Sequence, residues 1–296
     1  MPITSGSGNA PARFCVSRRG LPPYVSPDEM LRRFHLFEFH DLVWFPATFR
    51  DALTEWLAVL WDRTDACRAL APILQRVLQE SRAIQVIDLC SGAGGPLIGI
   101  QRELAAAGVS ATSLTYIVTD KFPNKIKMKD LERSTGGRIK AWLTSVDATS
   151  VPRELTGFRT LFNSFHHFPP RQATQILQDA YEARQPIGIF EIPNRKPLGI
   201  AFSFFASFLA VLLWMPSMRP KKMSWWLFTY VIPIIPLTAA WDGWVSHLRA
   251  YTPQELLRMT QDFSDSFAWE IRSVELQNGR FTVTCLLGLP RPRIDL

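Results

Sequence analysis

Residues Val86–Gly95 read Val-Ile-Asp-Leu-Cys-Ser-Gly-Ala-Gly-Gly, and this stretch determines the fold class that we predict. It completes a mostly apolar run that begins at Ile84, and a helix-like segment over Leu97–Leu104 follows it. A strand, a glycine-dense turn and a helix in this order are typical of an open α/β sheet that binds a nucleotide-like ligand. Glycines let the backbone turn tightly and approach the ligand closely. The start of the following helix offers free N–H groups and a partial positive charge.

The spacing of the turn residues favours one class of nucleotide. A dinucleotide fingerprint has the pattern G-x-G-x-x-G. Gly92 and Gly94 supply its first two glycines, but Leu97 occupies the sixth position. Asp88 stands at the strand end, where it would face a cationic group rather than a pyrophosphate. The pattern D-x-x-x-G-x-G resembles motif I of the class I S-adenosylmethionine (SAM)-dependent methyltransferases, with Cys90 in place of the usual first glycine of that family.

The resemblance implies a cofactor and its contacts. In that family an acidic residue at the first strand end lies near the methionine part of SAM, and the glycines pass under its ribose and methionine. The contacts implied for SAM in this stretch are Asp88, Cys90, Ser91, Gly92 and Gly94. Two alternatives stay open: a dinucleotide such as NAD or FAD, and a glycine turn that binds no cofactor.

Two more carboxylates follow apolar runs. Ser113–Thr119 predicts the second strand and leads into Asp120, and Ile139–Val146 predicts the third and leads into Asp147. A carboxylate at the second strand end can accept both ribose hydroxyls of an adenosine, in NAD enzymes as well. A carboxylate at the third strand end can accept the adenine amine, which resembles the methyltransferase arrangement, although it can also cap a helix. The cofactor contacts predicted here are Asp120, Lys121, Asp147 and Ala148.

The segment after the fourth predicted strand, Arg159–Asn163, reads Asn-Ser-Phe-His-His from Asn163 onward. In methyltransferases this segment lies beside the transferable methyl group. The Asn-x-x-His-His pattern resembles a variant found in small-molecule methyltransferases. The resemblance implies cofactor contacts at Asn163 and Ser164.

Candidate catalytic bases lie in the same region. His166 and His167 are the first candidates, because histidine titrates near neutral pH. Glu191, on the fifth predicted strand Ile187–Ile192, is the second. Alternatively, one histidine is a buried core residue and the other caps a helix.

We expect five parts along the chain. They are a mobile tail (1–25), an N-terminal helical cap (26–80), a SAM-binding core (81–196), an apolar helical insertion (197–245) and the C-terminal part of the core (246–296). The tail is rich in Gly, Pro and Ser. The cap opens with a capping box at Ser26.

Within the cap, Phe34–Pro46 alternates aromatic with ionisable side chains. One interpretation is that its aromatic residues pack on the core. The other is a lid over the cofactor cleft, with Glu38 and Asp41 facing the cleft. In a lid, Glu38 and Trp44 would contact the substrate.

The predicted insertion contains two apolar runs, Leu198–Met215 and Trp225–Trp241. The first carries no charge over 18 residues, which is long enough for a membrane helix. The loop between them holds Arg219, Lys221 and Lys222. Three interpretations follow: a helical lid over an apolar substrate pocket, an interfacial or re-entrant membrane anchor, or a spanning hairpin, which the positive-inside rule disfavours. All three place an apolar surface beside strand five, where the methyl acceptor binds in the family.

Polar side chains crowd after the insertion, at Asp242, His247, Arg249 and Tyr251. They form a polar turn or line the substrate pocket. In the second case His247 and Tyr251 are the substrate contacts that we predict. A second capping box begins at Thr252 and predicts a late helix there.

The end of the chain predicts a β-hairpin. Gln277-Asn278-Gly279 joins the segments Trp269–Leu276 and Arg280–Leu289, and its Asn-Gly pair is a strong turn signal for a hairpin. Five sequential strands linked by helices, followed by an antiparallel pair, form the seven-stranded methyltransferase topology. We therefore predict an α/β, Rossmann-like sheet of seven strands with helices on both faces. The resemblance spans about residues 80–290, apart from the insertion.

Composition limits the classes of partner. The 296 residues are 47% hydrophobic and 20% charged, which favours one globular α/β domain with additions. The net charge of +7 suits an anionic membrane surface; the basic residues are scattered, so we expect no nucleic-acid partner. The four cysteines form no C-x-x-C pair, so the sequence predicts no metal site and no disulfide framework. With no signal-peptide pattern, a cytoplasmic location fits, including the inner membrane surface.

The function that these observations predict is SAM-dependent methyl transfer to a small apolar acceptor at O, N or C. Two other classes compete with it: an NAD-dependent oxidoreductase, and a membrane-associated protein whose α/β domain senses a nucleotide. The sequence does not indicate an oligomeric state.

Overall fold

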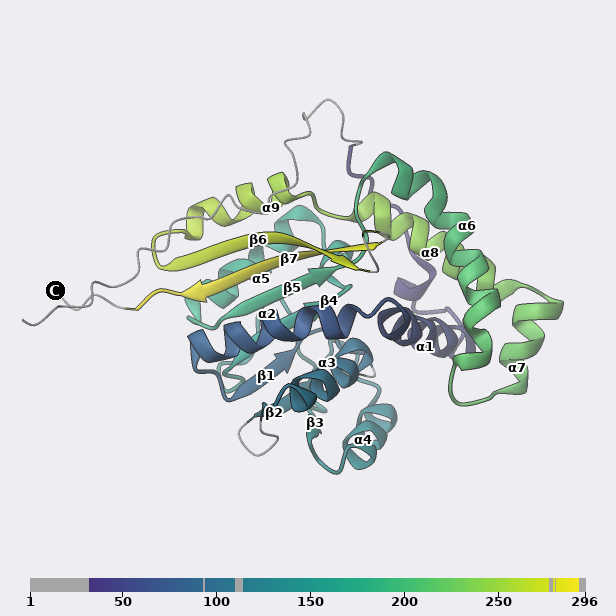
Figure 1. Ribbon diagram of the computed structural model, residues 1–296, viewed down its shortest axis with the longest axis horizontal. Helices are drawn as coiled ribbons and strands as arrows, with labels where there is room; N and C mark the ends of the chain where they lie inside the picture. The colour runs from purple at the N-terminus through teal and green to yellow at the C-terminus, as the bar shows by residue number, and fades with distance from the viewer. Residues whose placement is uncertain (1–31, 93, 110–113, 277–278, 280, 293–296) are drawn as a thin grey trace, which may run out of the picture.

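The computed structural model describes residues 32–92, 94–109, 114–276, 279 and 281–292 (Figure 1). The predicted tail and the predicted helix start at Ser26 lie outside these residues. The strands are β1 (Gln85–Asp88), β2 (Thr115–Val118), β3 (Ile139–Ala141), β4 (Phe158–Phe162), β5 (Ile187–Glu191), β6 (Phe267–Leu276) and β7 (Phe281–Pro290). The α-helices are α1 (Ala47–Arg63), α2 (Ala66–Ser81), α3 (Gly95–Ala106), α4 (Lys125–Ser134), α5 (Pro170–Glu182), α6 (Pro197–Trp214), α7 (Met223–Trp226), α8 (Ile234–Arg249) and α9 (Pro253–Thr260).

The seven strands form one sheet in the order β3-β2-β1-β4-β5-β7-β6. β1 to β5 run parallel, and β7 is antiparallel to both β5 and β6. The strand order reverses at β1, where Ile87 pairs with Ile117 of β2 on one side and with Arg159 of β4 on the other. In open α/β sheets ligands bind outside the carboxyl ends of the strands at such a switch point. The predicted seven-stranded α/β fold with a C-terminal antiparallel pair is confirmed.

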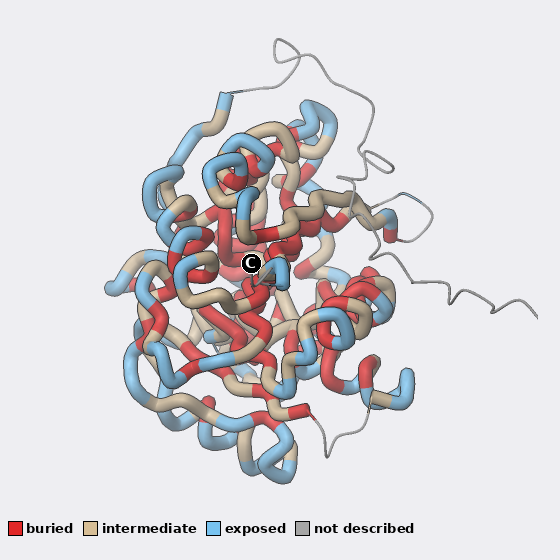
Figure 2. The backbone as a smooth tube through the Cα atoms, turned by 90° about the vertical axis from the view of Figure 1, so that its left-hand side faces the viewer, coloured by how far each residue is buried: buried red, intermediate tan, exposed pale blue. Residues whose placement is uncertain are grey.

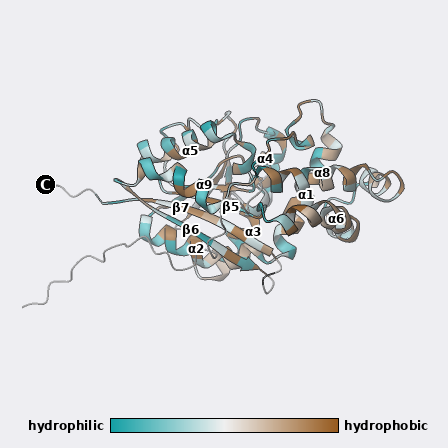
Figure 3. Ribbon diagram, turned by 90° about the horizontal axis from the view of Figure 1, so that it is seen from above, coloured by the Kyte–Doolittle hydropathy of each residue, from teal (hydrophilic) through white to brown (hydrophobic). Residues whose placement is uncertain are grey.

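Helices cover both faces of the sheet. On one face α2, α3 and α4 bury residues such as Leu74, Leu97 and Met128 against the strands. On the other face α5 and α9 do the same with Ile176 and Leu256. Figure 2 shows the buried interior and the exposed outer turns of the tube, and Figure 3 shows the sheet between its helices. Burial on both faces explains why β4 and β5 are buried at every position, as parallel strands usually are.

The helix ends largely follow the predicted signals. Thr252 and Glu255 form the predicted capping box at the start of α9. Asn124 caps α4 by accepting the N–H of Lys127. Gly136 and Gly137 follow α4 with φ of 60° and 76°, conformations that glycine adopts at little cost.

One predicted strand boundary is wrong. β3 ends at Ala141 rather than Val146, because the N–H of Val146 instead donates to the carbonyl of Asp120. Helix α2 begins at Ala66 and contains Pro72 in its interior. A proline there removes a hydrogen bond to the carbonyl of Arg68. The helix tolerates the loss because Arg68 is exposed and water can reach that carbonyl.

The insertion and α1 build a helical lobe next to the sheet. Val211 of α6, Trp225 of α7 and Ile235 of α8 share a buried cluster with Leu53 and Trp56 of α1. Figure 1 and Figure 3 place α6 and α8 beyond the end of the sheet towards which the parallel strands run. The lobe therefore lies where an open α/β sheet binds its ligands.

The second apolar run is broken by a sharp bend. Residues Met223–Val231 and Ile234–Arg249 meet at a bend of 76° next to Pro233. α8 then continues to Arg249, past residue 245, where we expected the insertion to end.

One helical stretch, Pro197–Ser217, is long and apolar enough to cross a membrane, although only 22% of its most apolar window is buried. Its exposed side chains follow one face of α6 at helical spacing. They are Leu198, Phe202, Phe205, Leu209 and Leu213. These side chains lie on the face of α6 opposite to the one that packs on α8, so this outer face is exposed.

Candidate active site

The turn after β1 contains several residues with positive φ. Cys90, Gly92 and Gly94 have φ of 58°, 57° and 95°. A Cβ on Gly94 would lie 2.4 Å from Leu131 Cδ2, whereas a Cβ on Gly92 would meet no atom within 4 Å. Ser91 anchors the turn, because its N–H donates to Thr119 O at 2.9 Å and its hydroxyl donates to Asp88 O at 2.7 Å. Gly92 therefore faces open space at the carboxyl end of β1.

Asp88 is a buried carboxylate at that strand end. It is 2% exposed, and Thr160 Oγ1 donates to its Oδ1 at 2.7 Å. The pKa of Asp88 is raised to about 7, mainly by burial and to a smaller extent by the nearby Asp120 carboxylate, in spite of this hydrogen bond. Among the residues that the structure describes, no lysine, arginine or histidine forms an ion pair with Asp88. A cationic ligand group would supply the charge that this carboxylate lacks.

Asp120 and Asp147 follow β2 and β3 at the same edge. Asp120 Oδ2 accepts the N–H of Gly92 at 2.9 Å, which links the second strand end to the glycine turn. Asp147 Oδ2 pairs with Lys121 Nζ at 2.7 Å. Burial alone would raise the pKa of Asp147, but hydrogen bonds from Lys121 and Thr149 lower it below its ordinary value.

Asp88, Asp120 and Asp147 follow three neighbouring parallel strands, so they lie at one edge of the sheet, as predicted. Cys90 lies in the turn after β1, where burial raises the pKa of its thiol and the charges of Asp120, Asp88 and Asp147 act in the same direction. Their assigned contacts with SAM stay predictions, since they depend on a bound ligand.

The other predicted cofactor residues occupy different surroundings. Asn163 has a φ of 45°, and its Oδ1 accepts the N–H of Ile192 at 2.9 Å. Ser164 Oγ is buried and has no hydrogen-bond partner among the residues whose placement is described. Ala148 is 3% exposed and packs in the hydrophobic layer under α5.

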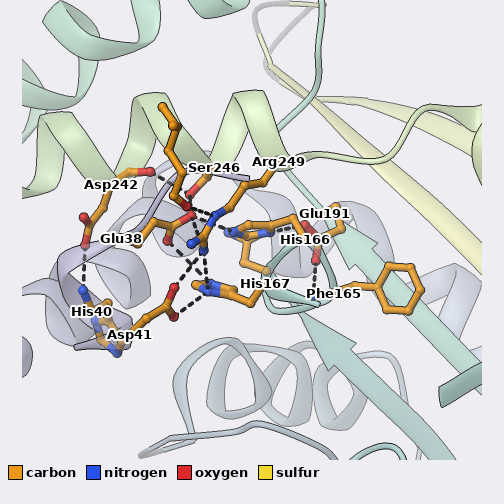
Figure 4. Close-up of polar contacts among 12 residues, drawn as sticks. Glu38, His40, Asp41, Phe165, His166, His167, Glu191, Asp242, Ser246 and Arg249 are labelled. Carbon is orange, nitrogen blue, oxygen red and sulfur yellow. Dashed lines mark hydrogen bonds and ion pairs between the residues drawn. The ribbon is translucent and has the colours of Figure 1, made fainter. Parts of the chain in front are cut away.

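Figure 4 shows a second polar cluster, built around His166 and His167 after β4. His166 is 2% exposed, and its Nδ1 contacts a carboxylate oxygen of Glu191 from β5. The other oxygen of Glu191 accepts the N–H of Phe165 at 2.8 Å. The sequence prediction that His166 and Glu191 share a site is consistent with this contact.

His167 is held from the other side. Its Nδ1 lies 2.8 Å from Asp41 Oδ1, and Arg249 Nη1 lies 2.8 Å from Asp41 Oδ2. Burial lowers the pKa of His167, but the carboxylates of Glu38 and Asp41 outweigh burial and raise it to about 9. The pKa of Asp41 falls well below its usual range, because hydrogen bonds and charge from His167 and Arg249 outweigh its burial.

Glu38 faces both imidazoles. Its Oε1 lies 3.7 Å from His166 Nε2 and its Oε2 lies 3.6 Å from His167 Nε2. Arg249 Nη1 lies 3.2 Å from Oε1, and Ser246 Oγ donates to the same oxygen at 3.2 Å. Glu38 is 3% exposed and lies between the two histidines and Arg249, whereas the predicted lid over a cofactor cleft stays a prediction.

Helix α8 fixes that segment. Asp242 Oδ1 accepts the N–H of Phe39 at 2.7 Å, and Arg249 Nε donates to Leu36 O at 2.6 Å. Burial, together with the charge of Glu38, raises the pKa of Asp242 to about 7. Asp242 and Arg249 were both singled out in the sequence, but the predicted helical insertion ended at residue 245, before Arg249. Their separation of seven residues, two helical turns, is the signal that would have placed them on one face.

The remaining predicted substrate residues lie in separate places. Trp44 is 71% exposed. His247 Nδ1 contacts Asn194 O at 2.7 Å, and burial lowers the pKa of His247. Tyr251 donates to Phe168 O at 2.6 Å, with the guanidinium of Arg33 over its ring. Their roles in substrate binding stay predictions.

An open apolar groove of about 390 Å³ lies next to the Glu38 segment. Phe37 and Phe39, the neighbours of Glu38 in sequence, line it together with Phe204 of α6 and Leu237 and Trp241 of α8. The groove thus connects the insertion with the segment that covers the histidines.

No family model and no curated protein matches the chain. Similar solved structures include the plantazolicin methyltransferase BpumL in complex with SAH, at 11% identity and TM-score 0.49, covering 82% of this chain and 96% of that one. The pyocyanin biosynthetic protein PhzM has 17% identity and TM-score 0.46, covering 78% and 56%. An O-methyltransferase family protein from Burkholderia thailandensis has 19% identity and TM-score 0.41, covering 77% and 58%.

The chain has the class I methyltransferase fold. It spans little more than half of the length of PhzM and of the Burkholderia protein. Because the identities are low and the TM-scores lie below 0.5, the fold assignment rests on the strand order and strand directions, and the activity of this chain is a separate question.

Proposed function

We propose that the chain is a SAM-dependent methyltransferase that acts on a small apolar acceptor. The observation that carries the proposal is Asp88, a buried carboxylate without a cationic partner in the described part of the chain, beside a turn with open space at Gly92. A cationic nucleoside fits this place better than an anionic pyrophosphate. Asp120 and Asp147 at the adjacent strand ends suit the ribose hydroxyls and the adenine amine.

In methyl transfer from SAM, the main contribution of the chain is to bind and align the two reactants. SAM supplies a methyl group that a positively charged sulfur already activates. Asp88 neutralises charge on the cofactor, and Asp120 fixes its ribose. The edge of the sheet and the segment around Glu38 hold the acceptor in line with the methyl group and exclude water.

A proton acceptor is needed if the methylated atom is a hydroxyl oxygen or an acidic carbon. His166 uses Nδ1 for its contact with Glu191, so its Nε2 is the atom that can take a proton. The raised pKa of His167 keeps that imidazole protonated near neutral pH, so His167 would orient the acceptor rather than take its proton. Glu191 holds His166 in orientation and is the second candidate. If the acceptor is an amine, its neutral lone pair suffices and these side chains only orient it.

The proposed acceptor is apolar because of the groove and the insertion. The groove beside Glu38 is lined almost entirely by apolar atoms, among them those of Phe37, Phe204 and Trp241. We also propose that the exposed face of α6 rests on the cytoplasmic surface of a membrane. The basic loop with Arg219, Lys221 and Lys222 would lie at the lipid headgroups, and the acceptor would enter from the lipid.

Mass spectrometry of the ligand that co-purifies with the full chain tests the enzyme assignment. We expect a mass of SAM or of its demethylated thioether. A bound nicotinamide dinucleotide would replace the proposal with the oxidoreductase alternative.

Flotation with vesicles tests the membrane proposal. We expect binding to vesicles that contain anionic phosphatidylglycerol and loss of binding in the variant Phe202→Glu/Leu209→Glu. The matched control is Ile98→Glu, which adds charge at an exposed residue of α3 outside the lobe. Equal binding of all three proteins would contradict the proposed surface.

A further inference from the structure

Glu38, His166 and His167 form a set of donor atoms that no sequence motif predicted, and we name these three residues the His–Glu cluster. One ligand atom from each residue lies within 4.8 Å of the other two. Two imidazole nitrogens and one carboxylate oxygen are a donor set typical of zinc and other first-row transition metals. Magnesium and calcium prefer sites built from oxygen atoms.

The second observation is the orphaned nitrogen of His166. Its Nε2 is buried, and within the described residues it has no hydrogen-bond partner. Buried polar atoms without a partner are uncommon, because they lose their contacts with water and gain nothing in return. This nitrogen points towards Glu38, at 3.7 Å from its Oε1, which is too long for a hydrogen bond (Figure 4).

Both histidines are supported in the way that metal-binding histidines are. The Nδ1 atoms contact carboxylates, Glu191 behind His166 and Asp41 behind His167. Such contacts keep the proton on Nδ1, orient the ring and leave the lone pair of Nε2 for a cation. Both Nε2 atoms face the same carboxylate of Glu38.

The spacing of the donor atoms is compatible with a site that contracts around a cation. Metal bonds of about 2.0–2.1 Å place neighbouring ligand atoms about 3.4 Å apart. Glu38 Oε2 lies 3.6 Å from His167 Nε2, and one ligand atom from each of the three residues lies within 4.8 Å of the other two. Arg249 contacts Oε1, so Oε2, the oxygen nearer His167, is the one available to a cation.

The local charge also favours a divalent ion. Three carboxylates (Glu38, Asp41 and Glu191) contact the two histidines. Two guanidiniums lie beside them, that of Arg249, paired with Glu38 and Asp41, and that of Arg33, which donates to His166 O at 3.0 Å. With the histidines neutral, as metal ligands must be, these groups carry one negative charge in excess. Asp242, which contacts the backbone of the same segment, lies behind Glu38 and would add to that excess when ionised.

We propose that the His–Glu cluster binds one divalent transition-metal ion, with zinc as the reference ion. Three protein ligands leave a fourth coordination position open. Catalytic zinc sites have such an open position, whereas structural zinc sites are closed by four protein ligands. The side chain of His167 is 26% exposed, which gives a route to that position. A metal ion and a free proton acceptor exclude each other at His166 Nε2, so the base role proposed above applies to the chain without metal.

The test uses the full chain, freed of metal with a chelator, and it needs neither SAM nor an acceptor. Equilibrium dialysis should give one zinc or one cobalt(II) ion per chain, and magnesium should not bind. Glu38→Gln and His167→Gln should each weaken zinc binding by more than Glu191→Gln, for which we expect a loss of about 10-fold to 100-fold. His35→Ala is the matched control, because it removes an exposed histidine three residues from Glu38 and should leave zinc affinity unchanged.

A measurement on the unaltered chain tests the same site without depending on whether the variants fold. Proton NMR of the cobalt(II) form should show two strongly shifted, exchangeable imidazole N–H signals, one from each Nδ1. Absence of stoichiometric zinc binding would overturn the proposal. So would zinc affinity that is unchanged in Glu38→Gln, or a cobalt form with fewer than two such signals. A methyltransferase that lacks this site would still satisfy the proposed function.

Discussion

The chain carries two polar regions at one edge of its sheet, and they are built in opposite ways. In the first, Asp88, Asp120 and Asp147 follow consecutive strands, and the buried carboxylate of Asp88 has no cationic partner among the described residues. In the second, Glu38 and Arg249 come from segments far apart in sequence, and most charges there are paired. The comparison indicates that the first region lacks a positive charge that a ligand could supply. The second region has most of its charges paired and instead has a nitrogen, His166 Nε2, that is unpartnered within the described residues and that a ligand could contact.

The largest expected effect separates the two regions by function. The double variant His166→Ala/His167→Ala should lower methyl transfer by at least about 10²-fold, because a positioned base contributes that much or more. Its SAM affinity should stay within about 2-fold, since the aspartate region is intact. Transfer of a labelled methyl group from SAM into an extract of apolar metabolites gives the activity, and calorimetry gives the affinity. Turnover equal to that of the unaltered chain would remove the base assignment.

The converse variant acts on the first region alone. Asp88→Asn should weaken SAM binding by about 10-fold to 100-fold, because hydrogen bonds to charged groups contribute about 1.5–3 kcal/mol. Asp130→Asn, an exposed carboxylate on α4 paired with Arg133, is the control and should bind SAM normally. Zinc affinity should not change in either variant. Normal SAM binding by Asp88→Asn would show that this carboxylate does not face the cofactor.

The glycine turn allows a smaller test within the first region. Gly94→Ala should destabilise the fold by about 1–3 kcal/mol, because alanine is strained at positive φ and its Cβ would lie 2.4 Å from Leu131. Gly92→Ala should cost less stability, since its Cβ would meet open space. Urea unfolding measures both. A larger loss of stability in Gly92→Ala would mean that the turn is packed differently.

The pH dependence of stability should distinguish the regions in the absence of ligands. The folded pKa of Asp88 is raised to about 7, so the unfolded chain loses this proton first and stability falls as pH rises from about 4 to 7. The folded pKa of His167 is raised to about 9, so its contribution is complete below about 6.5 and is lost as pH rises towards 9. Urea unfolding across pH should show a flatter lower range in Asp88→Asn and a flatter upper range in His167→Gln. Unchanged slopes in both variants would contradict these assignments.

The sequence predicts the first region well because its signals are local. Each aspartate follows an apolar run, and parallel strands bring their carboxyl ends to one edge, so Asp88, Asp120 and Asp147 could be placed together from strand order alone. The glycine turn has its own backbone signature. Only the length of β3 was misjudged, since an apolar run beyond Ala141 continues after pairing with β2 has ended.

The second region depends on packing between distant segments. Glu38 and Asp41 precede the first strand, and Arg249 ends α8, so no spacing rule connects them with His166. The second apolar run ends at Trp241, but α8 continues to Arg249, and the polar residues after Trp241 gave no sign of this continuation. The metal-binding arrangement became visible only when these side chains were placed in space.

Calorimetric titration of the full chain with SAM and, separately, with NAD tests the central claim most directly, namely that a sulfonium nucleoside lies across the three aspartates. The account predicts binding of one SAM per chain, weakened in Asp88→Asn, and no heat of binding for NAD. Binding of NAD without binding of SAM would contradict it.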